Sequence, residues 1–272
     1  MRSAKPTILG ILNLTPDSFS DGGRFGTPQQ ALQRALAMRD AGADMIDVGG
    51  ESTRPGAREI SPAEELRRVL PVIKKLKEKK IRVSLDSRHA AVVAACLPYI
   101  DWINDVSGMR DPDMRQLAAK SRKPIIIMHA TELPVDPTKT PRYKNVVTDL
   151  TSFFKKRIKE CEASGMQKKK IMIDPGIGFG KNLTHNLQLL ANVDKLEKIA
   201  PVCLGASRKS FIGKIDPAAA VLRQAQDDRL RLGGSLAAAL AGYQQGVRIF
   251  RVHDVAETAQ ALKVAAKIES CT

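Results

Sequence analysis

Short apolar runs recur along the whole chain and are separated by longer stretches of mixed composition. Runs that are apolar at nearly every position are typical of parallel strands buried on both faces. The first run, TILGILNL, is interrupted only by the polar Asn13 near its end. The runs predict eight strands, at 7–14, 44–50, 82–86, 102–106, 124–129, 170–176, 202–207 and 248–253.

Each predicted strand is followed by a segment with helical signals. Thr27 and Pro28 supply a cap and a first-turn proline, and Gly42 ends the helix that they open. Ser61 is followed three residues later by Glu64, a spacing that predicts a capping box. The further helices are expected near 62–79, 90–97, 111–120, 145–164, 185–199, 217–245 and 254–268.

Strict alternation of strands and helices implies a parallel sheet. Eight such units close naturally as an α/β barrel, the (β/α)8 TIM barrel, and 272 residues suit a barrel of ordinary size. A doubly wound sheet is the main alternative, but it usually carries a G-x-G-x-x-G fingerprint after its first strand, and none occurs there. No linker interrupts the pattern, so we expect one catalytic domain over 1–272.

The composition is that of a globular protein, with 43% hydrophobic residues. No apolar run approaches the roughly 20 residues that are needed to cross a bilayer. The N-terminal segment lacks the pattern of a signal peptide. The four cysteines are far apart in the sequence, which favours reduced thiols over disulfide or zinc pairs. We therefore expect a cytoplasmic protein with no membrane partner.

The net charge of +15 allows three interpretations: a nucleic-acid protein, a general attraction for an anionic substrate, or a solvated basic surface. Aromatic residues make up only 4% of the chain, which leaves little material for base stacking, and we expect no nucleic-acid partner. The densest lysine runs, 74–80 and 168–170, lie at predicted helix ends, where lysines favourably cap carbonyl groups.

Polar motifs follow nearly all of the predicted strands, at the end where barrel enzymes build their active sites. Asn13 ends the first strand, and the glycine-rich segment 15–27 after it is either a lid over a ligand or a surface turn. Strand two ends in GGESTRPGA, where Thr53 and Arg54 offer a hydroxyl and a guanidinium to an anion. A merely solvated arginine is the alternative for Arg54.

Asp86, Asn104 and Asp174 each close an apolar strand. Buried carboxylates need partners, so a helix cap or an internal ion pair is the structural alternative, above all for Asp86. Converging on one pocket, these groups would bind a ligand rich in N–H donors, such as a flat heterocycle with a guanidine-like edge. The sequence thus predicts an enzyme with one composite pocket.

The last two strands end in SRKS, 207–210, and RVHDV, 251–255. Loops after strands seven and eight of a barrel frequently bind phosphate. Arg251 and His253 share a face, because alternate residues of a strand do, and their donors suit an oxyanion. A purely structural histidine is the alternative for His253. The helix that opens near Asp254 would add its positive dipole end.

Five motifs together resemble the signatures of the dihydropteroate synthase family, a family of pterin-binding TIM barrels, and they occur in that family's order. They are GILNLTPDSFSDGG at 10–23, VGGESTRPGA at 48–57, DPGIGFGK at 174–181, SRKSFIG at 207–213 and RVHDV at 251–255. The resemblance implies a transferase of folate biosynthesis that joins 6-hydroxymethyl-7,8-dihydropterin diphosphate to 4-aminobenzoate. The products are 7,8-dihydropteroate and diphosphate.

The resemblance also implies the substrate-binding residues, and these small molecules are the partners that we expect. The pterin would be bound by Asp86, Asn104, Asp174, Lys209 and Arg251, of which all but Asn104 are expected to be catalytic. The diphosphate would be bound by Asn13, Thr53, Arg251 and His253, with Mg²⁺ near Asn13. The aminobenzoate would be bound by Phe19, Arg54, Pro55, Phe179, Ser207 and Lys209. Sulfonamide binding and a homodimer formed through the last helices are inherited expectations as well.

The chain departs from the family pattern at a few places. Ser87 replaces the usual threonine and keeps its hydroxyl, and Ile177 stands where phenylalanine is common, which predicts a slightly reshaped pocket wall. The segment 223–235 is unusually polar, and the sequence assigns it no role. A methyltransferase that acts on methyltetrahydrofolate is the alternative enzyme, but it would not need the diphosphate motifs.

Overall fold

The computed structural model describes residues 5–15, 27–52, 57–132, 136, 139, 142–216 and 228–271. Parallel strands form one sheet of eight in the order β6-β5-β4-β3-β2-β1-β8-β7. An isolated parallel bridge between Ile173 and Val202 joins the two ends of that order and closes the barrel. The strands are β1 (Thr7–Asn13), β2 (Met45–Gly49), β3 (Val83–Asp86), β4 (Trp102–Asp105), β5 (Ile125–Met128), β6 (Ile171–Asp174), β7 (Cys203–Leu204) and β8 (Ile249–Val252).

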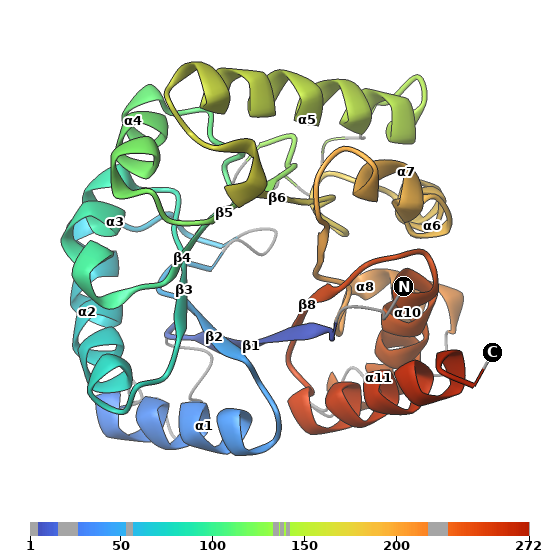
Figure 1. The fold of residues 1–272 in the computed structure, drawn as a ribbon, viewed down its shortest axis with the longest axis horizontal. Helices are drawn as coiled ribbons and strands as arrows, with labels where there is room; N and C mark the ends of the chain where they lie inside the picture. The colour runs from blue at the N-terminus through green and yellow to red at the C-terminus, as the bar shows by residue number, and fades with distance from the viewer. Residues whose placement is uncertain are drawn as a thin grey trace.

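Helices surround the ring of strands on its outside (Figure 1). Short 3-10 helices occur at Leu97–Tyr99, Lys168–Lys170 and Asp228–Arg231. The α-helices are α1 (Pro28–Asp40), α2 (Pro62–Glu78), α3 (Ala90–Cys96), α4 (Pro112–Ser121), α5 (Val146–Ala163), α6 (Leu183–Ala191), α7 (Val193–Glu197), α8 (Ser210–Ile215), α10 (Leu232–Gln244) and α11 (Val255–Glu269). The predicted barrel and its strict alternation are therefore confirmed.

The element boundaries differ from the prediction in the second half of the chain. Strand β7 covers only Cys203–Leu204, and the helix expected over 185–199 is divided at Asn192, where φ is −132°. The short helix α8 was not predicted. Of the helix expected over 217–245, α10 forms the part from Leu232 onward, and residues 217–227 lie outside the described part of the chain.

The predicted helix starts have a visible chemical cause. Thr27 and Gln30 form a complete capping box at α1. At α2 the Ser61 side chain accepts a hydrogen bond from the backbone N–H of Glu64, as predicted. The Glu64 carboxylate forms a salt bridge with Arg68 instead of returning to the cap, so half of the expected box is present.

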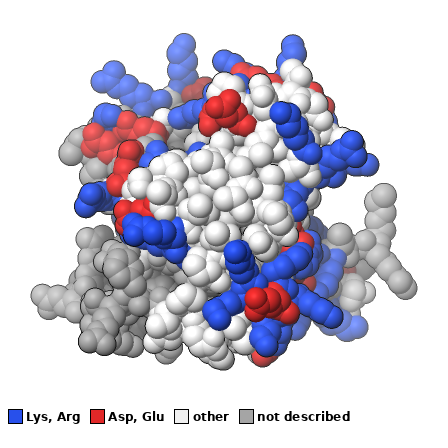
Figure 2. Space-filling model, turned by 90° about the vertical axis from the view of Figure 1, so that its left-hand side faces the viewer, with Lys and Arg blue, Asp and Glu red and all other residues white. Residues whose placement is uncertain are grey.

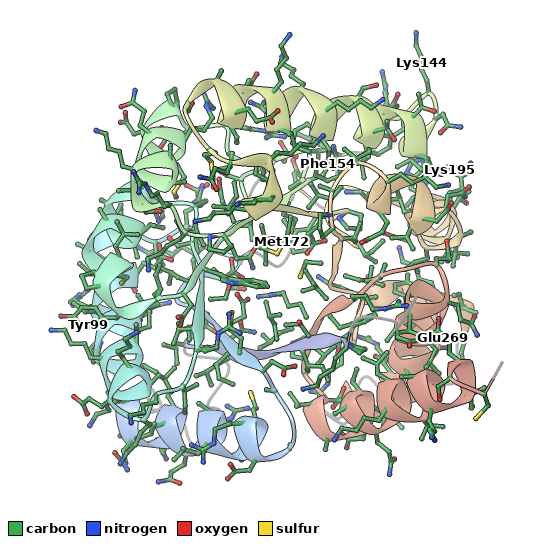
Figure 3. All side chains as sticks on the ribbon, in the orientation of Figure 1. Tyr99, Lys144, Phe154, Met172, Lys195 and Glu269 are labelled. Carbon is green, nitrogen blue, oxygen red and sulfur yellow. The ribbon has the colours of Figure 1, made fainter. Side chains whose placement is uncertain are left out.

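Apolar side chains fill two layers of the barrel. The larger layer lies between the strands and the helices and includes Phe154 of α5. The smaller one lies inside the ring of strands, where Figure 3 shows Met172 near the centre. Leu9, Met45, Ile126 and Cys203 pack with Met172 in this interior cluster. The interior is thus a packed floor, which is typical of TIM barrels.

Polar residues replace apolar ones toward the carboxyl ends of the strands. In register, Asn13 pairs with Gly49, Gly49 with Asp86, and Asp86 with Asn104, so these positions lie at one level of the barrel. Because successive side chains of a strand alternate between its faces, these residues share the inward face with the apolar floor below them. The strand pattern alone therefore gathers the polar side chains above the interior cluster.

Charged side chains of both signs lie on the outer surface. Figure 2 shows the side of the barrel formed by α2, α3 and α4, where basic and acidic side chains surround an uncharged centre. The described helices include none that is both long enough and apolar enough to cross a membrane.

Candidate active site

Arg251 is the centre of an ion-pair cluster above the barrel floor. Its Nε donates to Oδ2 of Asp47 at 2.6 Å, and its Nη2 donates to Oδ2 of Asp86, also at 2.6 Å. The three side chains come from β8, β2 and β3; β2 pairs directly with β3, and β1 lies between β2 and β8. Asp47 is completely buried. A buried guanidinium that donates to two carboxylates through two of its nitrogens is held in a fixed orientation.

Burial and charge oppose each other in this cluster. Burial raises the pKa of Asp86 to about 7, although the Arg251 guanidinium acts in the opposite direction. Burial by itself would lower the pKa of Arg251, but the carboxylates of Asp47 and Asp86 outweigh it and raise that pKa above its usual value. Arg251 therefore remains charged, while the protonation state of Asp86 is sensitive to the charge of a ligand that binds beside it.

Asn104 extends the cluster to β4, along the ring of polar side chains at the carboxyl ends of the strands, which we call the rim. Its amide nitrogen lies 3.4 Å from both carboxylate oxygens of Asp47, and the residue is 2% exposed. Its Oδ1 is buried and has no hydrogen-bond partner among the described residues. An orphaned buried acceptor is costly, so this oxygen is suited to receive an N–H group of a ligand.

Asp174 supplies a further carboxylate at the end of β6. Its Oδ1 accepts a hydrogen bond from the backbone N–H of Gly176 at 2.7 Å. Burial raises the pKa of this carboxyl, while the Gly176 hydrogen bond and the positive charges of Lys209 and Arg251 partly oppose the rise. A Cβ placed on Gly205 would lie 3.4 Å from Asp174 Oδ2, so the glycine leaves space beside the second oxygen.

Two lysines lie near Asp174. The ammonium of Lys209 lies 4.2 Å from the centre of the Phe179 ring, a cation–π distance. Lys181 is buried, and its Nζ donates to the backbone carbonyls of His129 and Phe179 at 3.2 and 2.9 Å. Burial lowers the pKa of Lys181 to about 7, and burial together with Lys181 lowers that of His129 to about 3. Lys181 thus ties the loop after β6 to the end of β5.

Ser207 and His253 meet at the ends of β7 and β8. The Ser207 hydroxyl oxygen accepts a hydrogen bond from the His253 backbone N–H at 3.2 Å and lies 3.3 Å from His253 Nδ1. Ser207 is buried, and His253 is half-buried. This contact joins the SRKS and RVHDV motifs at one point of the rim.

The predicted site residues are largely brought together. Asp86 contacts Arg251 directly, Asn104 joins them through Asp47, and Asp174 interacts electrostatically with Arg251. The structural alternative weighed for Asp86, an internal ion pair, is therefore present. That ion pair is compatible with binding, because Asp86 ends β3 and its side chain is still 13% exposed. Phe19, Thr53, Arg54 and Pro55 lie outside the described residues.

Asp47 is a member of the cluster that the sequence analysis missed. It lies in the middle of DMIDVGG rather than at the strand end, so the pattern of polar strand ends does not include it. The alternation of side chains between the two faces of a strand could have indicated Asp47. Asp47 precedes Gly49 by two positions, and Gly49 is in register with Asp86, so the two carboxylates face the same side.

The two departures from the family pattern have different settings. Ser87 is buried, and its Oγ accepts a hydrogen bond from the His89 backbone N–H at 3.2 Å, so its hydroxyl has a local structural role. Ile177 is completely buried within the main hydrophobic cluster. The expectation that Ile177 shapes a pocket wall is therefore wrong, since the residue packs in the core.

The donor set can be tested against a metal ion. No group of three or more histidine, cysteine or acidic residues able to hold a metal occurs among the described residues. A Cβ on Gly49 would lie 3.7 Å from Asn13 Oδ1 and 3.6 Å from Asp86 Oδ2, so a glycine keeps the space between these oxygens open. Hard oxygen donors of this kind suit Mg²⁺ that is bound mainly by substrate phosphates and water.

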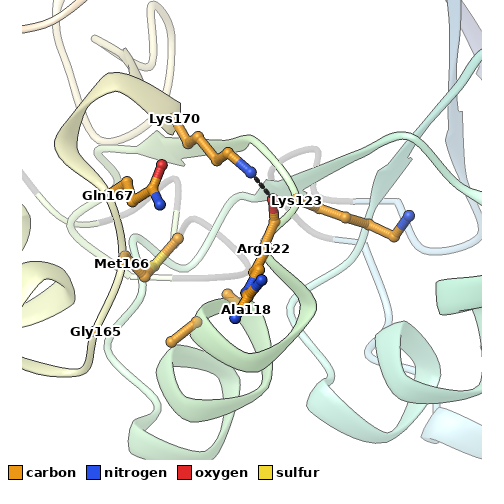
Figure 4. A pocket seen from close by; sticks show the side chains of 8 residues that line it. Ala118, Arg122, Lys123, Gly165, Met166, Gln167 and Lys170 are labelled. Atoms are coloured by element: carbon orange, nitrogen blue, oxygen red, sulfur yellow. Dashed lines mark hydrogen bonds between the residues drawn. The ribbon is translucent and has the colours of Figure 1, made fainter.

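A separate cavity of about 300 Å³ lies at the opposite end of the barrel, before β5 and β6 (Figure 4). Lys170 donates to the backbone carbonyl of Arg122 beyond the end of α4, and Lys123 donates to that of Ile100 at 2.7 Å. Of the predicted capping run 168–170, Lys170 donates to a carbonyl at the end of a helix, that of the C-cap residue Arg122 of α4. The lining residues are Ala118, Ala119, Arg122, Lys123, Gly165, Met166, Gln167 and Lys170.

The rim can therefore bind two kinds of group at once. Asp86, Asp174 and the orphaned oxygen of Asn104 accept hydrogen bonds and are suited to a ligand edge rich in N–H donors. Arg251, Lys209 and His253 donate and are suited to an anion. A small molecule with a cationic or N–H-rich ring and a phosphate group matches both halves. No Ser/His/Asp or Cys/His set for covalent catalysis is formed by these residues.

Comparisons with known proteins agree with this chemistry. The profile of the pterin binding enzyme family matches residues 9–253. The dihydropteroate synthase of Haemophilus influenzae is 44% identical over 262 residues, which cover 95% of this chain and 92% of that protein. The dihydropteroate synthase of Escherichia coli K12 is 41% identical over 267 residues, covering 95% of this chain and 90% of that protein.

Solved structures with the same fold contain related ligands. Dihydropteroate synthase from Clostridium difficile with pteroic acid has a TM-score of 0.88 and 41% identity, covering 98% of both chains. The Yersinia pestis enzyme in a sulfonamide complex has a TM-score of 0.89 and 42% identity, covering 98% of this chain and 95% of that one. The Xanthomonas albilineans enzyme with 4-aminobenzoic acid has a TM-score of 0.87 and 39% identity, covering 98% and 94%.

Proposed function

The chain belongs to the family of pterin-binding enzymes, among its dihydropteroate synthases, and from this premise we propose how its rim residues share the reaction. The enzyme is a transferase of folate biosynthesis. It condenses 6-hydroxymethyl-7,8-dihydropterin diphosphate with 4-aminobenzoate and releases 7,8-dihydropteroate and diphosphate. The contact of Arg251 with Asp86 is the observation that supports these roles most directly. It joins the basic residues, which would bind the diphosphate, to the acidic residues, which would bind the pterin.

The pterin ring is bound by the acids of the rim. Asp174 and Asp86 accept hydrogen bonds from ring N–H groups, and the unpartnered Oδ1 of Asn104 accepts another. Arg251 lies against the ring, and Lys209 donates to it. The buried setting strengthens each of these bonds, because the local dielectric constant is low. Asp86, Asp174, Lys209 and Arg251 are the groups that touch the reacting molecule and are catalytic in this sense.

The diphosphate lies at the basic side of the same rim. Arg251 and His253 donate to its oxygens, together with Asn13 and Thr53. Ser207 keeps His253 in place by accepting its backbone N–H. Neutralising the charge of a diphosphate makes it a good leaving group, so these donors act on the bond that breaks.

Mg²⁺ is proposed as the metal of this subsite, with Asn13 as its protein ligand. The open space over Gly49 beside Asn13 and the absence of a protein cage among the described residues fit an ion carried by the substrate. When bound, the ion neutralises charge on the departing diphosphate.

The aminobenzoate enters beside the reacting methylene. Lys209 and Ser207 lie at the end of β7, and the Phe179 ring lies under the Lys209 ammonium, so these residues offer a cation, a hydroxyl and an apolar face. A carboxylate and a flat ring match such a set. The proposed aminobenzoate residues are Phe19, Arg54, Pro55, Phe179, Ser207 and Lys209.

The transfer is a dissociative substitution. The bond between the pterin methylene and the diphosphate oxygen breaks, and both electrons leave with the diphosphate. The methylene cation is conjugated with the ring, whose N–H groups face Asp86 and Asp174, so the acids stabilise the positive charge. The aminobenzoate nitrogen then bonds to the methylene and loses a proton. The protein orients and stabilises, and it contributes no nucleophile.

A homodimer and a cytoplasmic location are part of the same proposal. The exposed apolar residues Val264 and Ile268 of α11 offer material for a dimer contact through the last helix. The four free cysteines, of which three are buried, suit a reducing compartment.

The test of the proposed function is a two-substrate assay of the purified chain. Diphosphate release is expected only when 6-hydroxymethyl-7,8-dihydropterin diphosphate, 4-aminobenzoate and Mg²⁺ are all present, and a sulfonamide is expected to compete with 4-aminobenzoate. Omitting each component in turn is the control. Methyl transfer from methyltetrahydrofolate without diphosphate release would instead support the alternative enzyme and would refute the proposal.

A further inference from the structure

Arg208 has an unusual backbone between two residues of the proposed aminobenzoate site. Its φ is +58°, in the left-handed region that side chains other than glycine rarely adopt. A closed set of hydrogen bonds holds this peptide. Arg208 N–H donates to Ser235 Oγ at 2.9 Å, Ser235 Oγ donates to Arg231 O at 2.7 Å, and Arg231 Nη1 donates to Arg208 O at 3.1 Å.

The Arg208 side chain is held as firmly as its backbone. Its Nε donates to Asp254 Oδ2 at 3.0 Å and its Nη2 donates to Asp254 Oδ1 at 2.5 Å, which is a bidentate pair. Asp254 is 9% exposed and makes no capping hydrogen bond to α11, although it stands at the N-cap position. The carboxylate is therefore committed to Arg208 rather than to its own helix.

The ion pair joins the two motifs that the proposed mechanism uses. Arg208 lies between Ser207 and Lys209, and Asp254 directly follows His253. A parallel contact, from the His253 backbone N–H to Ser207 Oγ, runs beside the ion pair at 3.2 Å. The loop after β7 and the end of β8 are thus joined at two adjacent positions, one of them bidentate.

We propose that Arg208 is a positioning residue, whose ion pair with Asp254 sets the aminobenzoate side of the rim at a fixed place relative to the diphosphate side. The inference rests on the proposed function and deepens it. Arg208 touches no substrate in this account. It acts through Ser207 and Lys209 on one side and through His253 on the other.

Position matters here because the reaction joins two substrates. The aminobenzoate nitrogen must lie in line with the methylene as the diphosphate leaves, and a displacement of about 1 Å can cost roughly 100-fold in rate. The segment that was unusually polar in the sequence gains a role, since Arg231 and Ser235 hold the Arg208 peptide. Each of these side chains then has a reason to be polar.

The experiment measures kcat and both KM values for Arg208→Ala, Arg208→Lys, Ser235→Ala, Asp254→Asn and the double variant of Arg208→Ala with Asp254→Asn. The matched control is Arg248→Ala, because Arg248 directly precedes β8, at the end opposite to Asp254, and like Arg208 it pairs with a carboxylate, that of Glu269 at 3.8 Å. Thermal unfolding of every variant is recorded, and rates are taken well below the unfolding temperature.

We expect Arg208→Ala to lower kcat by about 10- to 100-fold. The KM for the pterin diphosphate should stay within about threefold. Arg208→Lys should retain intermediate activity, since lysine makes a single contact. The double variant should lose little more than Arg208→Ala alone, because one interaction is removed in both. Arg248→Ala should keep the kcat of the unsubstituted enzyme.

The outcomes separate the inference from the proposed function. If the unsubstituted chain fails to release diphosphate, the proposed function is wrong. If that chain is active and Arg208→Ala matches Arg248→Ala in kcat at comparable stability, Arg208 has only a structural role and the inference is refuted. Should Arg208→Ala fail to fold, Arg208→Lys and Ser235→Ala decide, and unchanged kcat in both overturns the inference.

Discussion

Arg251 donates its Nε–H to Oδ2 of Asp47 at 2.6 Å, although 204 residues separate the two in sequence. The contact crosses β1, which lies between their strands β8 and β2 in the sheet. Asp47 is completely buried and therefore cannot itself be reached by solvent. Asp47 lies two residues before the end of β2, so its carboxylate balances the charge of Arg251 from the side of the barrel floor.

Asp47→Asn should weaken the enzyme through Arg251. The amide keeps one acceptor oxygen but removes the negative charge that holds the guanidinium, and a hydrogen bond to a charged group is worth about 1.5–3 kcal/mol. We expect kcat/KM for the pterin diphosphate to fall by about 10- to 100-fold, since each 1.4 kcal/mol is a factor of ten. Steady-state kinetics with saturating aminobenzoate measure the effect.

The control for Asp47 is Asp44→Asn, just before the other end of the same strand. Asp44 Oδ2 accepts the backbone N–H of Ile8 at 2.9 Å, so its loss affects stability and not the rim. We expect a lower unfolding temperature with normal kcat/KM. Equal kcat/KM in Asp47→Asn and Asp44→Asn would show that Asp47 does not position Arg251.

The contrast between Asp47 and Asp86 shows how far the sequence predicts the site. Asp86 ends an apolar run, and a polar residue at that place is visible from composition alone. Asp47 is followed by Val48 and two glycines, so only the alternation of the strand could have indicated its direction. Which of the rim residues contact one another depends on the register of strands that are remote in sequence, and that register is decided by packing.

The sequence predicted the parts of the fold that depend on local signals, but not those that depend on contacts between remote segments. Alternating apolar runs and helix caps indicated the barrel, because these are local signals. The break at Asn192, between α6 and α7, was not indicated. Nor was the shortness of β7, where the barrel closes through one bridge between Ile173 and Val202. Such a closing contact is a property of the assembled barrel rather than of either segment.

Asp174→Asn should impair pterin binding while preserving the loop after β6. Asparagine can still accept the backbone N–H of Gly176, which Asp174 Oδ1 accepts at 2.7 Å. It removes the charge that would accept ring N–H groups, and the loss of a charged hydrogen bond corresponds to about 10- to 100-fold in affinity. Titration of the protein with a pterin, followed by calorimetry, measures the change directly.

Lysine or arginine at position 174 gives a stronger form of the same prediction. A cation there would face Lys209 and Arg251, which already act on this carboxyl, and it would repel the N–H edge of the pterin. We expect no detectable pterin binding. Full activity of Asp174→Asn would show that the ring edge does not meet this residue.

His129→Gln should flatten the dependence of stability on pH. Burial and the charges of Lys181 and Arg110 lower the pKa of His129 to about 3, whereas the unfolded chain takes up the proton near its ordinary pKa of 6.5. The unfolded state then binds more protons as pH falls below 6.5, so stability is lost on acidification. The contribution reaches about 2 kcal/mol at pH 5, since one pKa unit corresponds to about 1.4 kcal/mol.

Urea unfolding at pH 7 and pH 5 measures this contribution, and glutamine keeps an acceptor for Lys181. The control is His185→Gln, because His185 is only partly buried and glutamine suits its capping-box position at α6. We expect the loss of unfolding free energy between the two pH values to shrink in His129→Gln and to persist in His185→Gln. An equal loss in all three proteins would contradict a neutral His129.

Gly176→Ala should destabilise the protein far more than Gly165→Ala, although both glycines have positive φ, +64° and +94°. A Cβ on Gly176 would lie 2.0 Å from the backbone oxygen of His129, whereas a Cβ on Gly165 meets nothing within 4 Å. Backbone strain alone costs about 1–2 kcal/mol, so Gly165→Ala measures that strain. The clash at Gly176 requires β5 and the loop after β6 to separate, which should add at least about 2 kcal/mol.

Because the Gly176 N–H is donated to Asp174, pterin affinity should fall together with stability in Gly176→Ala, and only in that variant. Equal unfolding free energies for the two variants would show that this loop can move away from β5 without cost.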